Sequence, residues 1–99
     1  MTDLVSSKKD KIIELCRKHH IKRFSVFGSV LRDDFRPDSD IDILVEFEPG
    51  KTPGFAFYGI EIELSELLGR QVDLSTPDGL SHFFRDQVLR ESQPIYEAA

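Results

Sequence analysis

Two aspartates, Asp40 and Asp42, stand one residue apart at the start of an apolar segment. Residues two apart in a strand face the same side, so both carboxylates would project together. Two adjacent negative charges are unfavourable unless a cation joins them. Mg²⁺ suits such a pair, because it binds a few carboxylates together with phosphate oxygens and water. The pair therefore predicts a metal site that accepts a phosphate-bearing ligand.

A third acid, Asp73, lies between Val72 and Leu74 in a second short apolar segment. An acid in such a place is unusual on burial grounds, although an edge residue facing solvent would explain it as well. If the two segments are neighbouring strands, Asp73 joins Asp40 and Asp42. Three carboxylates can hold two Mg²⁺ ions, which stabilise the attacking and leaving oxygens of an in-line displacement.

The dipeptide Gly28-Ser29 follows an apolar strand segment and precedes a short helical turn. A glycine lets the backbone approach a phosphate closely, and the N-terminus of a helix offers free N–H groups to an anion. Ser29 can cap the turn and also contact a phosphate. Taken alone, the same dipeptide fits a plain turn better, because a strand followed by Gly-Ser and a helix is a common turn.

Hydrophobic periodicity and breaker residues define the elements that position these groups. They predict helices over residues 6–19, 55–68 and 77–90, and strands over 23–27, 41–47, 71–75 and 94–96. We expect Ser6 or Ser7 to cap the first helix and Gly69 to end the second. The strand over 41–47 is nearly all apolar, which predicts a central strand covered on both faces. The order predicts an α/β fold in a single domain over residues 1–99.

Apolar residues at helical spacing predict the buried faces of the two later helices. They are Phe57, Ile60, Leu64, Leu67 and Leu68 in one, and Leu80, Phe83, Phe84 and Val88 in the other. In the first helix, Cys16 continues the apolar stripe, which indicates a core residue rather than a nucleophile. His19 and His20 are adjacent and point in different directions, so we interpret them as solvated histidines.

Composition restricts the classes of function. The formal net charge of −5 and scattered basic residues argue against direct nucleic-acid binding. No apolar run approaches the roughly 20 residues that span a membrane, and the first residues do not resemble a signal peptide. One cysteine excludes an intramolecular disulfide. These features predict a cytoplasmic protein without a membrane partner.

Three sequence motifs together resemble the DNA polymerase beta-like nucleotidyltransferase superfamily. They are Gly28-Ser29-Val30-Leu31-Arg32, Ser39-Asp40-Ile41-Asp42-Ile43-Leu44-Val45 and Val72-Asp73-Leu74. The resemblance covers roughly residues 8–97 and, at this length, is to the minimal nucleotidyltransferase (MNT) subfamily. It implies a small mixed β-sheet packed against helices, as in the polymerase beta palm. In prokaryotes, such proteins typically serve as antitoxins beside a HEPN-domain toxin, which is an RNase.

The resemblance also implies roles for individual residues. Asp40, Asp42 and Asp73 would bind Mg²⁺, with two ions expected, and Asp73 would help to deprotonate the attacking hydroxyl. The residues expected to contact the nucleotide, with ATP as substrate, are Gly28, Ser29, Arg32 and Ser39.

Two details of the first motif leave nucleotide contacts open. Arg32 would serve an ion pair with Asp33, Asp34 or Asp38 equally well. The chain also departs from the common pattern, with Leu31 where alanine is frequent and Asp33 where glycine is frequent. Asp33 places an extra negative charge near the phosphates, which bears on nucleotide affinity but leaves the three carboxylates untouched.

We expect the protein to transfer AMP from ATP to a hydroxyl of a partner HEPN toxin. The alternative is an antitoxin that neutralises its partner by binding alone. Modification of a small molecule or of nucleic acid is a third hypothesis, disfavoured by the lack of a second domain and by the negative charge. The expected partners are thus a nucleoside triphosphate and a toxin, and self-association stays open.

Overall fold

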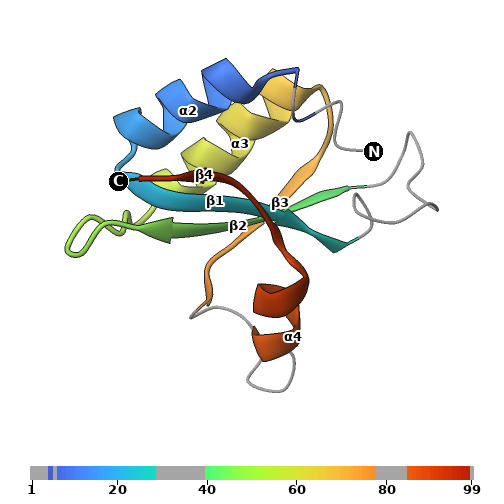
Figure 1. Ribbon diagram of the computed structural model, residues 1–99. Helices are drawn as coiled ribbons and strands as arrows, with labels where there is room; N and C mark the ends of the chain where they lie inside the picture. The colour runs from blue at the N-terminus through green and yellow to red at the C-terminus, as the bar shows by residue number, and fades with distance from the viewer. Residues whose placement is uncertain (1–4, 6, 29–39, 78–84, 99) are drawn as a thin grey trace.

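The protein, described here by a computed structural model, folds around one four-stranded sheet (Figure 1). The structure describes residues 5, 7–28, 40–77 and 85–98. The strands are β1 (Ile21–Phe27), β2 (Ile41–Phe47), β3 (Val72–Ser75) and β4 (Gln93–Glu97), and their order is β3-β2-β1-β4. β1 pairs antiparallel with β2 and β4, whereas β2 and β3 are parallel. The expected α/β fold with a small mixed sheet is confirmed.

The helices divide between the two sides of the sheet. α2 (Lys9–Lys18) and α3 (Ala56–Leu68) cover one face, and α4 (Arg85–Glu91) lies on the other side (Figure 1). Because side chains alternate along a strand, β2 turns one row of apolar residues towards α2 and α3. Those residues are fully or almost fully buried and form one core with the helices: Ile41, Ile43, Val45 and Phe47. The other row faces away from this core: Asp42, Leu44 and Glu46.

The helix α2 packs on the sheet through Ile12, Leu15 and Cys16. Burial raises the pKa of the Cys16 thiol to about 12, so the thiol stays protonated at neutral pH. This confirms Cys16 as a core residue. The expected serine cap is wrong, because Lys8 occupies the cap position and no side chain there accepts a hydrogen bond.

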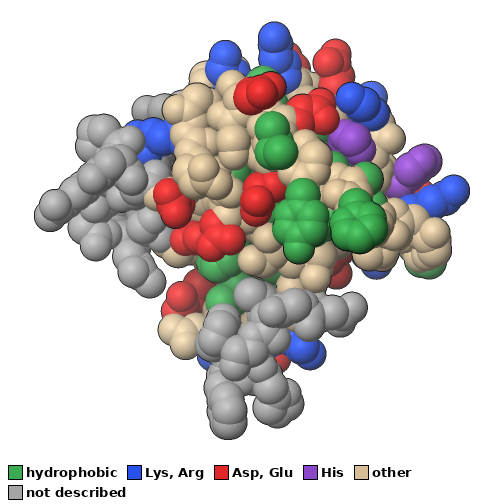
Figure 2. Space-filling view, turned by 180° about the vertical axis from the view of Figure 1, so that it is seen from behind, with side chains coloured by type: hydrophobic (Ala, Val, Ile, Leu, Met, Phe, Trp, Pro, Cys, Tyr) green, Lys and Arg blue, Asp and Glu red, His purple; other side chains and the backbone are tan. Residues whose placement is uncertain are grey.

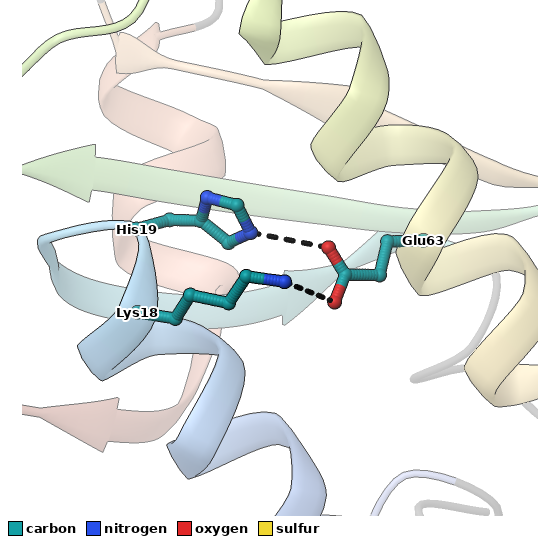
Figure 3. A network of polar contacts seen from close by, with 3 residues as sticks. All are labelled: Lys18, His19 and Glu63. Carbon is teal, nitrogen blue, oxygen red and sulfur yellow. Dashed lines mark hydrogen bonds and ion pairs between the residues drawn. The ribbon is translucent and has the colours of Figure 1, made fainter.

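The end of α2 is tied to the middle of α3 by one carboxylate (Figure 3). Oε1 of Glu63 lies 3.1 Å from Nε2 of His19, and Oε2 lies 3.4 Å from Nζ of Lys18. The hydrogen bond from His19, helped by the charge of Lys18, lowers the pKa of Glu63. The expectation of solvated histidines therefore holds for the exposed His20 but is wrong for the half-buried His19.

The helix α3 matches its predicted limits and apolar face. Ile60, Leu64 and Leu68 are buried, and Gly69 ends the helix in the left-handed conformation with φ 68°. Phe57 and Leu67 pack against the core from its margin.

The helix predicted over residues 77–90 agrees less well with the structure, in which α4 is described over Arg85–Glu91. α4 contains no buried residue, and its Val88 is half-buried. Leu80, Phe83 and Phe84, which were expected on its inner face, lie outside the described residues. The short strand expected over 94–96 is present as β4, at the edge of the sheet.

The surface of α3 carries exposed apolar side chains beside acids. Phe55, Tyr58 and Ile62 are the most exposed large hydrophobic residues in the described part of the chain. Figure 2, which views the molecule from behind, shows hydrophobic side chains next to a gathering of acidic ones. Within the described ranges, no helix is both long enough and apolar enough to span a bilayer.

Candidate functional site

The parallel pairing of β2 with β3 places Asp42 directly opposite Asp73. Ile41 and Ile43, on either side of Asp42, are opposite Val72 and Leu74 and share their buried face. Directly paired residues project from the same face of a sheet. The carboxylates of Asp42 and Asp73 therefore emerge side by side, on the face turned away from α2 and α3.

The surroundings of Asp73 differ from the expectation of unusual burial. β3 is an edge strand, and Asp73 is exposed while its neighbours Val72 and Leu74 are buried. The edge position facing solvent, the simpler explanation of this acid, thus applies. It does not exclude a site, because the same strand also places the acid beside Asp42.

Asp40 comes just before β2 and is exposed. Across the described ranges, no three His, Cys, Asp or Glu side chains are grouped closely enough to hold a metal ion by themselves. The described geometry thus provides a pair of carboxylates, Asp42 and Asp73, rather than the expected cluster of three. A pair fits the usual demand of Mg²⁺, which takes one or two carboxylates and completes its octahedron with phosphate oxygens and water.

Gly28 follows β1 and lies against the side chain of Asp42. Its φ is 75°, a conformation that favours glycine. A Cβ built on Gly28 would collide with Oδ2 of Asp42 and would lie 3.1 Å from its Cγ. The pairing of Phe27 with Asp42 explains this closeness, because it places Gly28 just past that pair. The sequence suggested that glycine admits a phosphate, whereas the described contact is with the Asp42 carboxylate.

The remaining residues predicted to contact the nucleotide are Ser29, Arg32 and Ser39. They lie outside the described residues. A groove of about 510 Å³ lies elsewhere, between α2 and α3. Its lining mixes lysines with glutamates, including Lys11, Lys18, Glu63 and Glu66, so it offers no concentrated positive charge for a triphosphate.

A family model described as the nucleotidyltransferase domain matches residues 9–95 of the chain. The chain belongs to the nucleotidyltransferase family. The match spans β1, β2 and β3 and therefore includes Gly28, Asp42 and Asp73. The resemblance drawn from the three sequence motifs is confirmed at the level of the family.

Similar proteins include a candidate protein adenylyltransferase of Methanocaldococcus jannaschii. It is 40% identical to this nucleotidyltransferase over 91 residues, which are 92% of this chain and 97% of the relative. A solved structure of a candidate minimal nucleotidyltransferase superposes with a TM-score of 0.78 at 40% identity, covering 93% of this chain and 95% of that one. A toxin–antitoxin crystal structure with AMP-PNP gives a TM-score of 0.75 at 25% identity, covering 91% and 73%.

Two residues near the site of this nucleotidyltransferase were not found from the sequence. Glu61 and Ser65, both half-buried on α3, accept hydrogen bonds from the backbone of β3. The helical pattern places them beside the apolar stripe, where polar residues normally face water. Their spacing of four residues shows that they share one side of α3, but no sequence signal names the strand that they contact.

Proposed function

We propose that this nucleotidyltransferase uses Mg²⁺ and ATP to transfer AMP to a hydroxyl group of a partner HEPN-type toxin, and so acts as an antitoxin. The observation that carries the proposal is the register of β2 and β3, which sets Asp42 beside Asp73 on the open face. The name of the Methanocaldococcus jannaschii relative supports AMP as the transferred group and protein as the acceptor. The AMP-PNP bound in the toxin–antitoxin structure supports ATP as the nucleotide.

In the proposed site, Asp42 and Asp73 would hold the metal as a pair, and we propose Asp40, which is not grouped with them in the described positions, as a third ligand. Two Mg²⁺ ions would supply charge neutralisation at the triphosphate. Gly28 leaves the Asp42 carboxylate the space that it occupies on the open face, where it would serve as a ligand. We assign the nucleotide contacts to Gly28, Ser29, Arg32 and Ser39.

The transfer is an in-line displacement at the α-phosphorus. The acceptor oxygen forms a bond to phosphorus, the bond to the bridging oxygen of the β-phosphate breaks, and pyrophosphate leaves. The carboxylate of Asp73 takes the proton of the hydroxyl. Because Asp73 is exposed at the edge of the sheet, a hydroxyl carried by another protein can reach it. That exposure suits a macromolecular acceptor.

A protein partner must supply the orientation of the acceptor, which contributes much of the rate in such reactions. The net charge of −5 is complementary to a basic, RNA-binding surface and would steer the encounter. The solved toxin–antitoxin relative supports a toxin as the partner. We place the reaction in the cytoplasm, where ATP and Mg²⁺ are available.

The test is co-expression with the neighbouring gene product, followed by intact mass measurement of the partner. We expect mass increments of AMP on the partner with the wild type and none with Asp73→Asn. Asp10→Asn is the matched control, because Asp10 is exposed in the first turn of α2. A partner that is neutralised without any increment in mass would refute the transfer and leave an antitoxin that acts by binding alone.

A further inference from the structure

The outer edge of β3 is bound by side chains of α3. In the described part of the chain β3 is an edge strand, so the backbone groups of Val72 and Leu74 that point away from β2 meet no neighbouring strand there. The Val72 N–H donates to Oγ of Ser65 at 3.0 Å, and the Leu74 N–H donates to Oε2 of Glu61 at 2.9 Å. Two successive outward donors of the strand are therefore satisfied by one helix.

The geometry of this clamp, Glu61 and Ser65 on α3, matches the spacing of the strand. Four residues of helix advance about 6 Å, and two residues of strand advance about 6.7 Å. The hydroxyl of Ser65 also donates to the carbonyl oxygen of Glu61 at 2.9 Å, which fixes its orientation for the incoming N–H. The clamp therefore matches two successive outward N–H groups of β3, and the short connection of residues 69–71 between α3 and β3 makes these the groups of Val72 and Leu74.

Asp73 lies between the two clamped residues. A slip of β3 by one residue would turn Asp73 into the core, which the burial of Val72 and Leu74 already opposes. A slip by two residues would keep the same face outward but would move Asp73 away from Asp42. Burial alone opposes the two-residue slip weakly. Outward N–H groups recur every second residue, so the clamp opposes this slip together with the short connection of residues 69–71, which brings Val72 and Leu74 to Ser65 and Glu61.

We propose that Glu61 and Ser65 are positioning residues that hold Asp73 in register with Asp42 for metal binding. The inference rests on the proposed function for its consequence in metal binding, but the register itself is independent of any ligand. Neither side chain needs to contact the metal or the nucleotide, because both act through the backbone of β3.

The experiment compares Glu61→Ala, Glu61→Gln and Ser65→Ala with the wild type. The control is Glu63→Ala, which removes a glutamate of the same helix that contacts α2 rather than β3. Three measurements are made: amide hydrogen exchange at Val72 and Leu74, cross-strand backbone NOEs between β2 and β3, and the affinity for Mn²⁺ in the presence of a non-hydrolysable ATP analogue.

We expect Glu61→Ala to speed exchange at Leu74 about tenfold, because a partly buried donor loses its acceptor. The NOEs around Asp73 should weaken, and Mn²⁺ affinity should fall about tenfold, the lower end of what is usual when support for a ligand is lost. Ser65→Ala should act in the same way through Val72. Glu61→Gln keeps an acceptor oxygen and should restore both register and affinity, and Glu63→Ala should leave Mn²⁺ affinity unchanged.

Unchanged NOEs and Mn²⁺ affinity in both alanine variants, despite faster exchange, would overturn the positioning role. An equal loss of affinity in Glu63→Ala would overturn it too, because the effect would then be one of general stability. Failure of the proposed function has a different signature. The wild type would then bind no Mn²⁺ with the ATP analogue, while the NOEs would still respond to Glu61→Ala.

Discussion

The contact between Gly28 and Asp42 predicts that Gly28→Ala damages the site more than the fold. The new methyl group would collide with Oδ2 of Asp42, and the backbone there has φ 75°. The colliding atom belongs to a side chain, so the collision can be relieved by rotating the carboxylate away. The side chain that yields is the one proposed to bind the metal.

The two costs of this substitution can be estimated separately. A non-glycine residue in the left-handed conformation costs about 1–2 kcal/mol of folding free energy. Displacing a positioned group by about 1 Å costs a reaction about a hundredfold in rate. We therefore expect Gly28→Ala to lower the free energy of unfolding by about 1–2 kcal/mol and to lower AMP transfer by about a hundredfold.

A matched control separates strain from collision. Gly50 has φ 77°, and a Cβ built on it has nothing within 4 Å. Gly50→Ala should therefore cost a similar free energy of unfolding in urea titrations, while AMP transfer per folded molecule stays near the wild-type rate. If both variants transfer AMP equally well, the close packing of Gly28 on Asp42 has no functional role and the reasoning is refuted.

Three further predictions concern the core and the contact between α2 and α3. The hydrogen bond from His19 lowers the pKa of Glu63 in the folded protein. The Glu63 carboxylate therefore stabilises the fold above the ordinary glutamate pKa, and this stabilisation is lost as the pH falls through the lowered pKa. Because the Glu63 side chain is 41% exposed, Glu63→Gln should reduce the loss of unfolding free energy on acidification by only a few tenths of a kcal/mol. Thermal unfolding between pH 3 and 7, roughly bracketing the carboxylate range, measures this difference. The Cys16 thiol, with its pKa raised to about 12, should resist iodoacetamide at neutral pH and react only in denaturant; rapid alkylation of the native protein would contradict its burial. Leu64 is fully buried, so Leu64→Ala should lower the free energy of unfolding by about 2–5 kcal/mol in urea, and a loss below 1 kcal/mol would contradict the packing.

The sequence predicted those parts of the fold that depend on local patterns. α3 is bounded by Gly69 and shows an apolar face at helical spacing, and β2 is a nearly continuous apolar run, so both were located closely. β1 begins at Ile21, earlier than the predicted start at residue 23. The positive φ of His20 ends the turn after the helix, so the strand starts at the next residue, the buried Ile21.

Contacts between distant segments could not be predicted in this way. The Asp-x-Asp motif and the isolated Asp73 indicated a common site, but their register depends on which strands pair. Glu61 and His19 look like ordinary solvent-facing residues in a helical pattern, because their partners lie 13 and 44 residues further along the chain. The reason for Gly28 was equally hidden, since a sequence shows that a glycine is present and not which side chain occupies the space beside it.

The occupied edge of β3 also limits how this protein can associate with others. An exposed edge strand normally invites strand addition, in which another chain extends the sheet through backbone hydrogen bonds. Here the outward N–H groups of Val72 and Leu74 are taken, and Gln71 donates to the Val72 carbonyl at 3.3 Å. The opposite edge, β4, contains Pro94, which has no N–H to offer. The β3 border of the sheet is therefore a poor template for extension or aggregation, and Pro94 removes one donor from the β4 border, so a partner that meets the β3 side has to recognise side chains rather than free backbone groups.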